Sequence, residues 1–139
     1  MLQRMQSLWL LLASAFAILS FQFPFYSGTN KDGVASFKLF PDTHHFMLLL
    51  FTILVAVVSL LSIFLFKNRT LQLRFTLLAL LLEIILLALY FKEASSFVSG
   101  TGTIALTSLL QLFIVVFLLL AVKGIRHDNK IIRDSERLR

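Results

Sequence analysis

The chain has 139 residues, of which 58% are apolar and only 14% are charged, and it contains no cysteine. A typical soluble domain is roughly half apolar and about a quarter charged, so this composition excludes an ordinary soluble fold, and the lack of cysteine excludes a disulfide scaffold, a thiolate metal site and a thiol nucleophile. Thirteen Lys and Arg against seven Asp and Glu give a net charge of +6, which in a soluble protein would suggest a nucleic-acid partner.

Four apolar runs account for most of the chain, and each approaches the length of about 20 residues that a helix needs to cross the hydrocarbon of a bilayer. They cover residues 8–25, 46–66, 71–91 and 104–122. The small residues Ala13, Ser14 and Ala15 could form the cleavage site of a signal peptide. Because the apolar run continues well beyond them, we expect a retained first span rather than a cleaved leader.

The connections between the runs set the topology. The second connection is only a few residues long, so the spans on either side of it must form a tight antiparallel hairpin. The first connection contains Val34–Phe40 between turn residues, and the third is rich in Gly, Ser and Thr. We therefore expect an all-α membrane protein with one domain over residues 1–139. It is an antiparallel four-helix transmembrane bundle in which residues 34–40 form a short β-pairing with residues 97–103.

The distribution of basic residues predicts the orientation. Ten of them lie at the N-terminus, in the second connection and in the tail, and three lie in the first and third connections. The first group comprises Arg4, Lys67, Arg69, Arg74, Lys123, Arg126, Lys130, Arg133, Arg137 and Arg139, and the second comprises Lys31, Lys38 and Lys92. Short flanks rich in Lys and Arg stay in the cytoplasm, so both termini are predicted to be cytoplasmic. The basic segments contain no aromatic residues on which bases could stack, and nucleic acid is not expected as a partner.

The tail, residues 123–139, mixes six basic with three acidic residues. The favoured interpretation is a helical extension of the last span whose basic side chains lie along anionic lipid head groups. The alternative is a docking segment for a cytoplasmic partner, which the mixed signs of charge favour mildly. The residues assigned to head-group or docking contacts are Arg4, Arg126, Arg133, Arg137 and Arg139.

One charged residue lies deep within an apolar run, where a charge is unfavourable. Glu83 lies twelve residues into the third run, roughly 18 Å from the cytoplasmic end at about 1.5 Å per residue. Thr76, Ala79 and Tyr90 share its helical face, which we expect to turn into the bundle. Gln111 is predicted at a similar depth on the fourth run, roughly 11 Å from the periplasmic end. The expected arrangement is a buried hydrogen bond between a protonated Glu83 and Gln111.

The pair Glu83 and Gln111 has three interpretations. The simplest one is an interhelical fastener worth about 1 kcal/mol. The others are a site that handles a proton or a cation, and a contact with another subunit. His44 and His45, beside Asp42, are weak candidates for half of a metal site, because adjacent residues on a helix point about 100° apart and no further His or Cys is near in sequence. No metal and no cofactor is expected.

The two ends of the chain carry its most specific residues. Gln3, Arg4 and Gln6 precede the first apolar run, and the polar tail containing Ile131-Ile132-Arg133-Asp134 ends in Arg-Leu-Arg. With these ends and its layout, the chain resembles an uncharacterised family of small four-span inner-membrane proteins from Bacteroidota, catalogued as domain of unknown function 4293. The resemblance implies the inner membrane of a Gram-negative bacterium, with a periplasmic outer side, and it implies no activity.

The function predicted from these patterns is non-catalytic. The chain has no Gly-rich phosphate loop, no nucleophile elbow and no zinc-protease motif. We expect an accessory or scaffold subunit of a larger bacterial inner-membrane complex, in contact with the lipid bilayer and with other membrane subunits or further copies of itself. The alternatives are a small proton-coupled transporter or a carrier of lipids or other hydrophobic molecules built around Glu83, and a membrane-embedded enzyme, for which support is thin.

Overall fold

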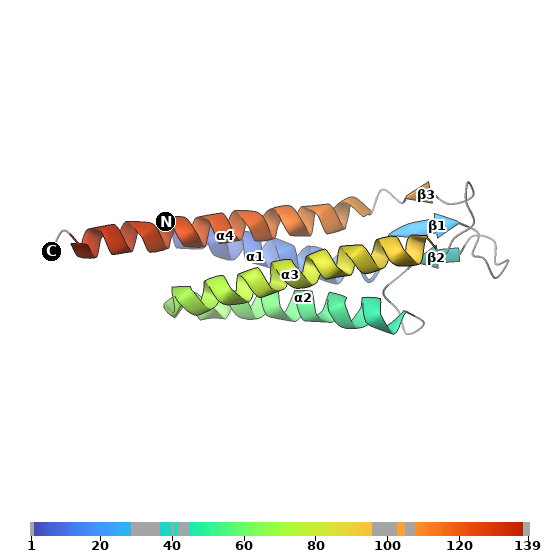
Figure 1. Ribbon diagram of the computed structural model, residues 1–139, viewed down its shortest axis with the longest axis horizontal. Coiled ribbons are helices and arrows are strands. Elements are labelled where there is room, and N and C mark those ends of the chain that lie inside the picture. The colour runs from blue at the N-terminus through green and yellow to red at the C-terminus, as the bar shows by residue number, and fades with distance from the viewer. Residues whose placement is uncertain are drawn as a thin grey trace.

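Helices dominate the architecture. The computed structural model describes residues 2–28, 37–39, 41, 45–95, 103–104 and 108–137. Within them, four helices run antiparallel along one long axis: α1 (Leu2–Leu19), α2 (Phe46–Phe64), α3 (Arg69–Ala94) and α4 (Ser108–Arg137) (Figure 1). A single 3₁₀ turn, η1 (Leu65–Lys67), leads from α2 toward α3. The predicted tight hairpin between the second and third apolar runs is therefore confirmed.

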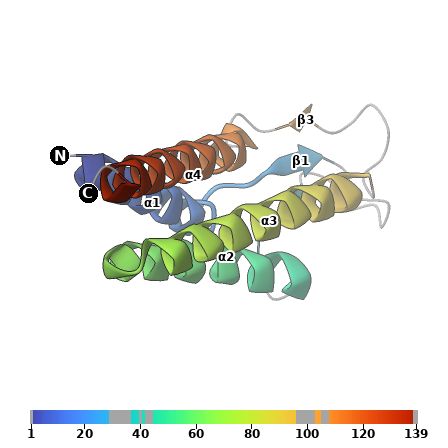
Figure 2. The ribbon, with the colours of Figure 1, turned by 60° about the vertical axis from the view of Figure 1, so that its left-hand side comes forward.

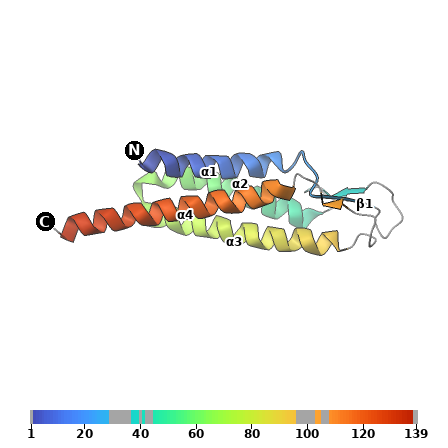
Figure 3. The same cartoon turned by 90° about the horizontal axis from the view of Figure 1, so that it is seen from above.

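The helices form a closed ring of neighbours. Helix α1 packs against α2 and α4, and α3 packs against the same two helices from the other side. Figure 2 shows the two layers of this arrangement, with α1 beside α4 and α2 beside α3. The start of α1 and the end of α4 lie together at one end of the bundle, which we call the terminal end, and a small sheet lies at the other, the sheet end (Figure 3).

The sheet has three short strands: β1 (Tyr26–Gly28), β2 (Phe37–Leu39) and β3 (Thr103–Ile104). Strand β1 is central and pairs antiparallel with both others, so that Tyr26 faces Leu39 on one side and Ile104 on the other. The short sheet expected in the connections is confirmed, but β1 lies between β2 and β3, so residues 37–39 do not pair directly with Thr103 as predicted. Residues 34–36, 40 and 97–102 lie outside the described residues.

Two helix boundaries differ from the apolar runs. Helix α1 begins at Leu2, ahead of the first run, and ends at Leu19, before Gln22 and Pro24. Helix α4 begins at Ser108, four residues later than the run that starts at Ile104. Three helices are long and apolar enough to cross a membrane, namely α2 with η1, α3, and α4 as far as Asp134, whereas the apolar part of α1, Met5–Leu19, is shorter.

The bundle buries polar side chains inside and exposes large apolar side chains on its surface. Large side chains such as Leu81, Ile84 and Leu112 are more than half exposed on the outer faces. Inside, hydroxyl side chains are buried, and each donates a hydrogen bond to a backbone carbonyl three or four residues earlier in the chain. These residues are Ser14, Ser20, Thr52, Ser59, Ser62 and Thr76. Such a distribution suits a bundle surrounded by lipid, where small and polar residues provide close helix contacts.

Candidate functional site

Glu83 faces the centre of the bundle. Its side chain is 0% exposed, as are Thr76 and Ala79 on the same face of α3, and Tyr90 is 1% exposed. The prediction of an inward face at these four positions is therefore confirmed. Among the described residues, neither carboxyl oxygen of Glu83 has a hydrogen-bond partner. An unsatisfied buried polar group is uncommon in native proteins, which makes this carboxyl group the first candidate for a function.

The predicted hydrogen bond between Glu83 and Gln111 is wrong. Gln111 is buried, but its carbonyl oxygen Oε1, like both oxygens of Glu83, has no partner within the described parts of the chain. The error comes from the start of α4, because Gln111 is only three residues from Ser108, which is about 4.5 Å into the helix. Tyr90 lies four residues from the end of α3 at Ala94, or about 6 Å, and it is therefore Tyr90 that shares the level of Gln111.

Tyr90 lies at the centre of a layer of buried polar side chains near the sheet end. Its hydroxyl group lies within hydrogen-bonding range of the side chains of Thr52 and Gln111, and the carboxyl group of Glu83 lies close enough to affect it electrostatically. The ring of Tyr90 stacks on Phe25, with 4.4 Å between the ring centroids. Helices α2, α3 and α4 and the chain that enters β1 thus meet at one tyrosine. This layer was not anticipated as a unit, although the seven-residue spacing of Glu83 and Tyr90 indicated a shared face.

His45 and Glu93 lie close together at the sheet end of the bundle. The Nδ1 atom of His45, just before α2, lies 3.7 Å from a carboxylate oxygen of Glu93 near the end of α3. His44 and Asp42 lie outside the described residues. Among the residues that are described, no group of three or more His, Cys, Asp or Glu side chains could hold a metal ion. The pair is therefore a contact between the ends of two helices, and sequence reasoning did not identify Glu93 as the partner of His45.

A second buried polar contact ties α1 to α4 at the terminal end. The side-chain nitrogen Nε2 of Gln6 donates a hydrogen bond of 2.6 Å to Oδ2 of Asp128, and both residues are at least 94% buried. Gly124, one turn earlier on α4, permits this approach, because a Cβ atom there would lie 2.9 Å from Cγ of Gln6. Asp128 is one of the three acidic residues of the tail, residues 123–139. Its spacing of three and seven residues from Ile125 and Ala121, which are both buried, is the signal that places it on the inward stripe of α4.

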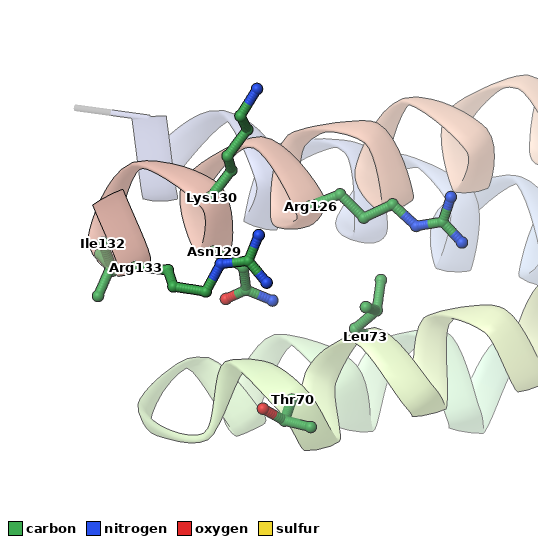
Figure 4. A pocket seen from close by; sticks show the side chains of 7 residues that line it. All are labelled: Thr70, Leu73, Arg126, Asn129, Lys130, Ile132 and Arg133. Atoms are coloured by element: carbon green, nitrogen blue, oxygen red, sulfur yellow. The ribbon is translucent and has the colours of Figure 1, made fainter. Parts of the chain in front are cut away.

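The basic residues assigned to head-group or docking contacts fall into two groups. Arg126 and Arg133 line a groove of about 490 Å³ between α4 and the start of α3 (Figure 4). Arg4 and Arg137 belong to α1 and α4, but their side chains lie outside the described part of the structure, as does Arg139 entirely. Helix α4 continues without a break through Arg137, so the predicted helical extension of the last span is confirmed.

Comparison with known proteins gives one match. Residues 2–138 match the family described as Domain of unknown function (DUF4293). No curated protein matches the chain, and no solved structure matches it.

Proposed function

Because the chain belongs to the DUF4293 family, whose description assigns no function, we propose from its geometry that it is a non-catalytic subunit of a larger complex in a bacterial inner membrane. In this proposal α1 is a fourth membrane span beside the three longer helices, and both termini lie in the cytoplasm. The positive charge gathered at the terminal end supports that orientation.

The observation that carries the proposal is the projecting end of α4. This helix has 30 residues, or about 45 Å, and it runs past the other helices at the terminal end (Figure 3). Beyond Asn129 the described side chains are exposed, including Ile131 at 47% and Ile132 at 39%. Side chains that are exposed at the end of a helix gain little from packing, so a partner surface that covers them would stabilise this segment.

The depth of these isoleucines favours a protein partner over lipid. The unbroken apolar run of α4 reaches Val122, and Lys123 follows. Ile132 is ten residues beyond Val122, or about 15 Å along the helix. The polar head-group layer adds only about 5–8 Å on each side of the hydrocarbon. Acyl chains therefore cannot cover Ile132, whereas an amphipathic partner helix with acidic and basic residues can pair with Lys130, Arg133 and Asp134.

Site-specific photo-cross-linking in the native membrane tests this proposal. A photoreactive residue at position 132 should yield a discrete cross-linked protein, because the partner covers that face. The same residue at position 112, in the outer face of the bundle that we assign to lipid, is the matched control and should yield mainly lipid adducts. Lipid adducts alone from both positions would contradict a protein partner at the projecting end.

A second candidate function follows from Glu83. A carboxyl group in the centre of a membrane bundle is costly as an anion unless it is paired or solvated, and that of Glu83 has no hydrogen bond among the described residues. A small proton-coupled transporter, or a carrier of lipids or other hydrophobic molecules, would use such a group. Proteoliposomes with an internal pH dye distinguish this candidate, because Glu83→Gln should abolish proton movement while Thr76→Val, on the same face, should retain it. Equal behaviour of the unaltered chain and Glu83→Gln would exclude it.

A further inference from the structure

A second groove lies at the terminal end, between α1 and α4, and we call it the α1–α4 groove. The two helices pack side by side there (Figure 3). The groove has a volume of about 410 Å³, within the range of roughly 300–1,000 Å³ that is typical of ligand pockets. Its apolar lining comes from Met5, Trp9 and Leu120, and its polar lining includes Lys123 and His127. The groove therefore combines an apolar surface with two side chains that can bind an anion.

The α1–α4 groove crosses the boundary between hydrocarbon and head groups that the sequence of α4 predicts. Leu120 lies two residues before Val122, the last residue of the unbroken apolar run, or about 3 Å on the hydrocarbon side. Lys123 and His127 lie one and five residues beyond Val122, or about 1.5 Å and about 7.5 Å along the helix. The head-group layer is about 5–8 Å thick, so both basic side chains start within it. The apolar part of the groove is thus level with acyl chains, and its polar part is level with phosphates.

Lys123 and His127 are placed to bind one phosphate group together. They are four residues apart on α4, so their side chains are neighbours on the helix surface, with about 5–6 Å between Cβ atoms. Both are exposed, and a lysine ammonium group and a histidine ring N–H group can each donate a hydrogen bond to a phosphate oxygen. Asp128 follows in sequence, but it is only 6% exposed and already accepts a hydrogen bond from Gln6. None of the described side chains that line the groove is acidic.

A seam of aromatic rings continues the groove toward the sheet end. Trp9 stacks on Phe117, with 5.8 Å between the ring centroids. Phe16 stacks on Phe117 at 5.4 Å and on Phe113 at 6.1 Å. Phe113, Phe117 and Leu120 recur at spacings of four and three residues, so they follow one side of α4. Phe113 is 48% exposed. An acyl chain that starts in the groove can therefore lie along this seam.

We infer that the α1–α4 groove binds an anionic phospholipid with one phosphate, such as a phosphatidylglycerol. The phosphate lies between Lys123 and His127, and one acyl chain lies on Trp9 and Phe117. The net negative charge of the head group favours this lipid over a zwitterionic one, whose own cation competes with Lys123 for the phosphate. The inference rests on the membrane placement in the proposed function and does not depend on a protein partner.

Quenching of tryptophan fluorescence tests the site, because Trp9 is the sole tryptophan of the chain and lines the groove. The full-length protein is reconstituted in vesicles of dioleoyl phosphatidylcholine. Increasing fractions of phosphatidylglycerol or phosphatidylcholine with brominated acyl chains are then included, since bromine quenches a tryptophan that it contacts. We expect half-maximal quenching at a fraction of brominated phosphatidylglycerol at least about tenfold lower than that of brominated phosphatidylcholine.

Two double variants show whether the groove carries this preference. Lys123→Gln/His127→Gln should lose the factor of about ten, because the phosphate loses both of its side-chain partners. The control Lys67→Gln/Arg69→Gln removes two basic side chains from the same end of the bundle, outside the groove, and should keep the preference to within about threefold. All four altered residues are exposed or partly exposed, and an unchanged melting temperature would verify that the variants fold.

Three outcomes would overturn the site. Equal quenching by the two brominated lipids would mean that lipid of either charge covers Trp9. Equal losses in both double variants would indicate attraction to the whole basic surface. Relief of the quenching by excess glycerol 3-phosphate, which has the phosphate but no acyl chain, would indicate a simple anion site. Each of these failures would leave the cross-linking result at position 132 unaffected, whereas no quenching by either lipid would also contradict the membrane placement.

Discussion

Replacing Glu83 with leucine should stabilise the bundle. Glu83 is 0% exposed, and both of its oxygens lack a hydrogen bond among the described residues, so the structure contains a polar group with no compensation for its burial. Removing such a group recovers about 1–3 kcal/mol of unfolding free energy. Leucine has a similar volume, so the change creates neither a large cavity nor severe overpacking. The expected result for Glu83→Leu is an increase in unfolding free energy of about 1–3 kcal/mol.

Reversible unfolding in mixed micelles, followed by circular dichroism, measures this change. Thr76→Val is the matched control, because the hydroxyl group of Thr76 donates a 2.8 Å bond to the carbonyl of Gln72 within the same helix. A helix that persists in detergent keeps that bond, so the control should change the unfolding free energy by less than about 0.5 kcal/mol. A loss of more than about 1 kcal/mol in Glu83→Leu would mean that the carboxyl group holds a partner, and the reasoning would fail.

The remaining predictions concern the other buried contacts, and the same unfolding assay checks each of them. Gln6→Ala should lower the unfolding free energy by about 1–3 kcal/mol, because it leaves the buried carboxyl group of Asp128 without its donor. The double variant Gln6→Leu/Asp128→Leu removes both polar groups and should stay within about 1 kcal/mol of the unaltered chain. Equal losses in the two variants would contradict this account. Gly124→Val should cost about 1–3 kcal/mol by forcing α1 away from α4, and no loss would show that Gln6 moves aside freely. Tyr90→Phe should lower the unfolding free energy by about 1 kcal/mol, since only the hydroxyl contacts are lost and the stacking on Phe25 remains. Tyr90→Ala, which also removes the ring, should lower it by about 3–5 kcal/mol. Similar losses in the two variants would assign the stability to the hydroxyl group.

The four helices could be predicted because each has an apolar run, but a run does not fix where a helix begins or ends. In α1 the polar residues Gln3, Arg4 and Gln6 precede the run and are nevertheless helical. In α4 the helix starts at Ser108 because Ile104 belongs to β3. Hydrophobicity alone cannot distinguish an apolar strand residue from the first residue of an apolar helix, and the difference in α4 follows from this ambiguity.

The inward face of α3 could also be predicted, whereas its partner could not. The spacing of Thr76, Ala79, Glu83 and Tyr90 depends only on the period of the helix. The level of Gln111 depends on the start of α4, and a displacement of four residues moves it by about 6 Å. That shift exceeds the reach of a hydrogen bond, so the predicted pair with Glu83 is replaced by the contact between Gln111 and Tyr90.

Two features had weak signals. Strand β1 is only three residues long, Tyr26–Gly28, and its serine and glycine are typical of turns. Asp128 lies in the charged tail, and the charge of this segment masks its helical periodicity. Its place three residues after Ile125 is the stronger signal, since a charged residue on a buried stripe requires a partner, and that partner, Gln6, is 122 residues away in sequence.

The most direct test of the proposed role is to purify the full-length chain from its native membrane by gentle extraction and to identify by mass spectrometry what remains bound. The account predicts another membrane protein in stoichiometric amount, which is lost when Ile131→Ser and Ile132→Ser are combined and retained with Leu112→Ser. A chain that purifies alone, or only with copies of itself, and behaves identically with and without these substitutions would contradict the claim that the projecting end of α4 joins it to a larger complex.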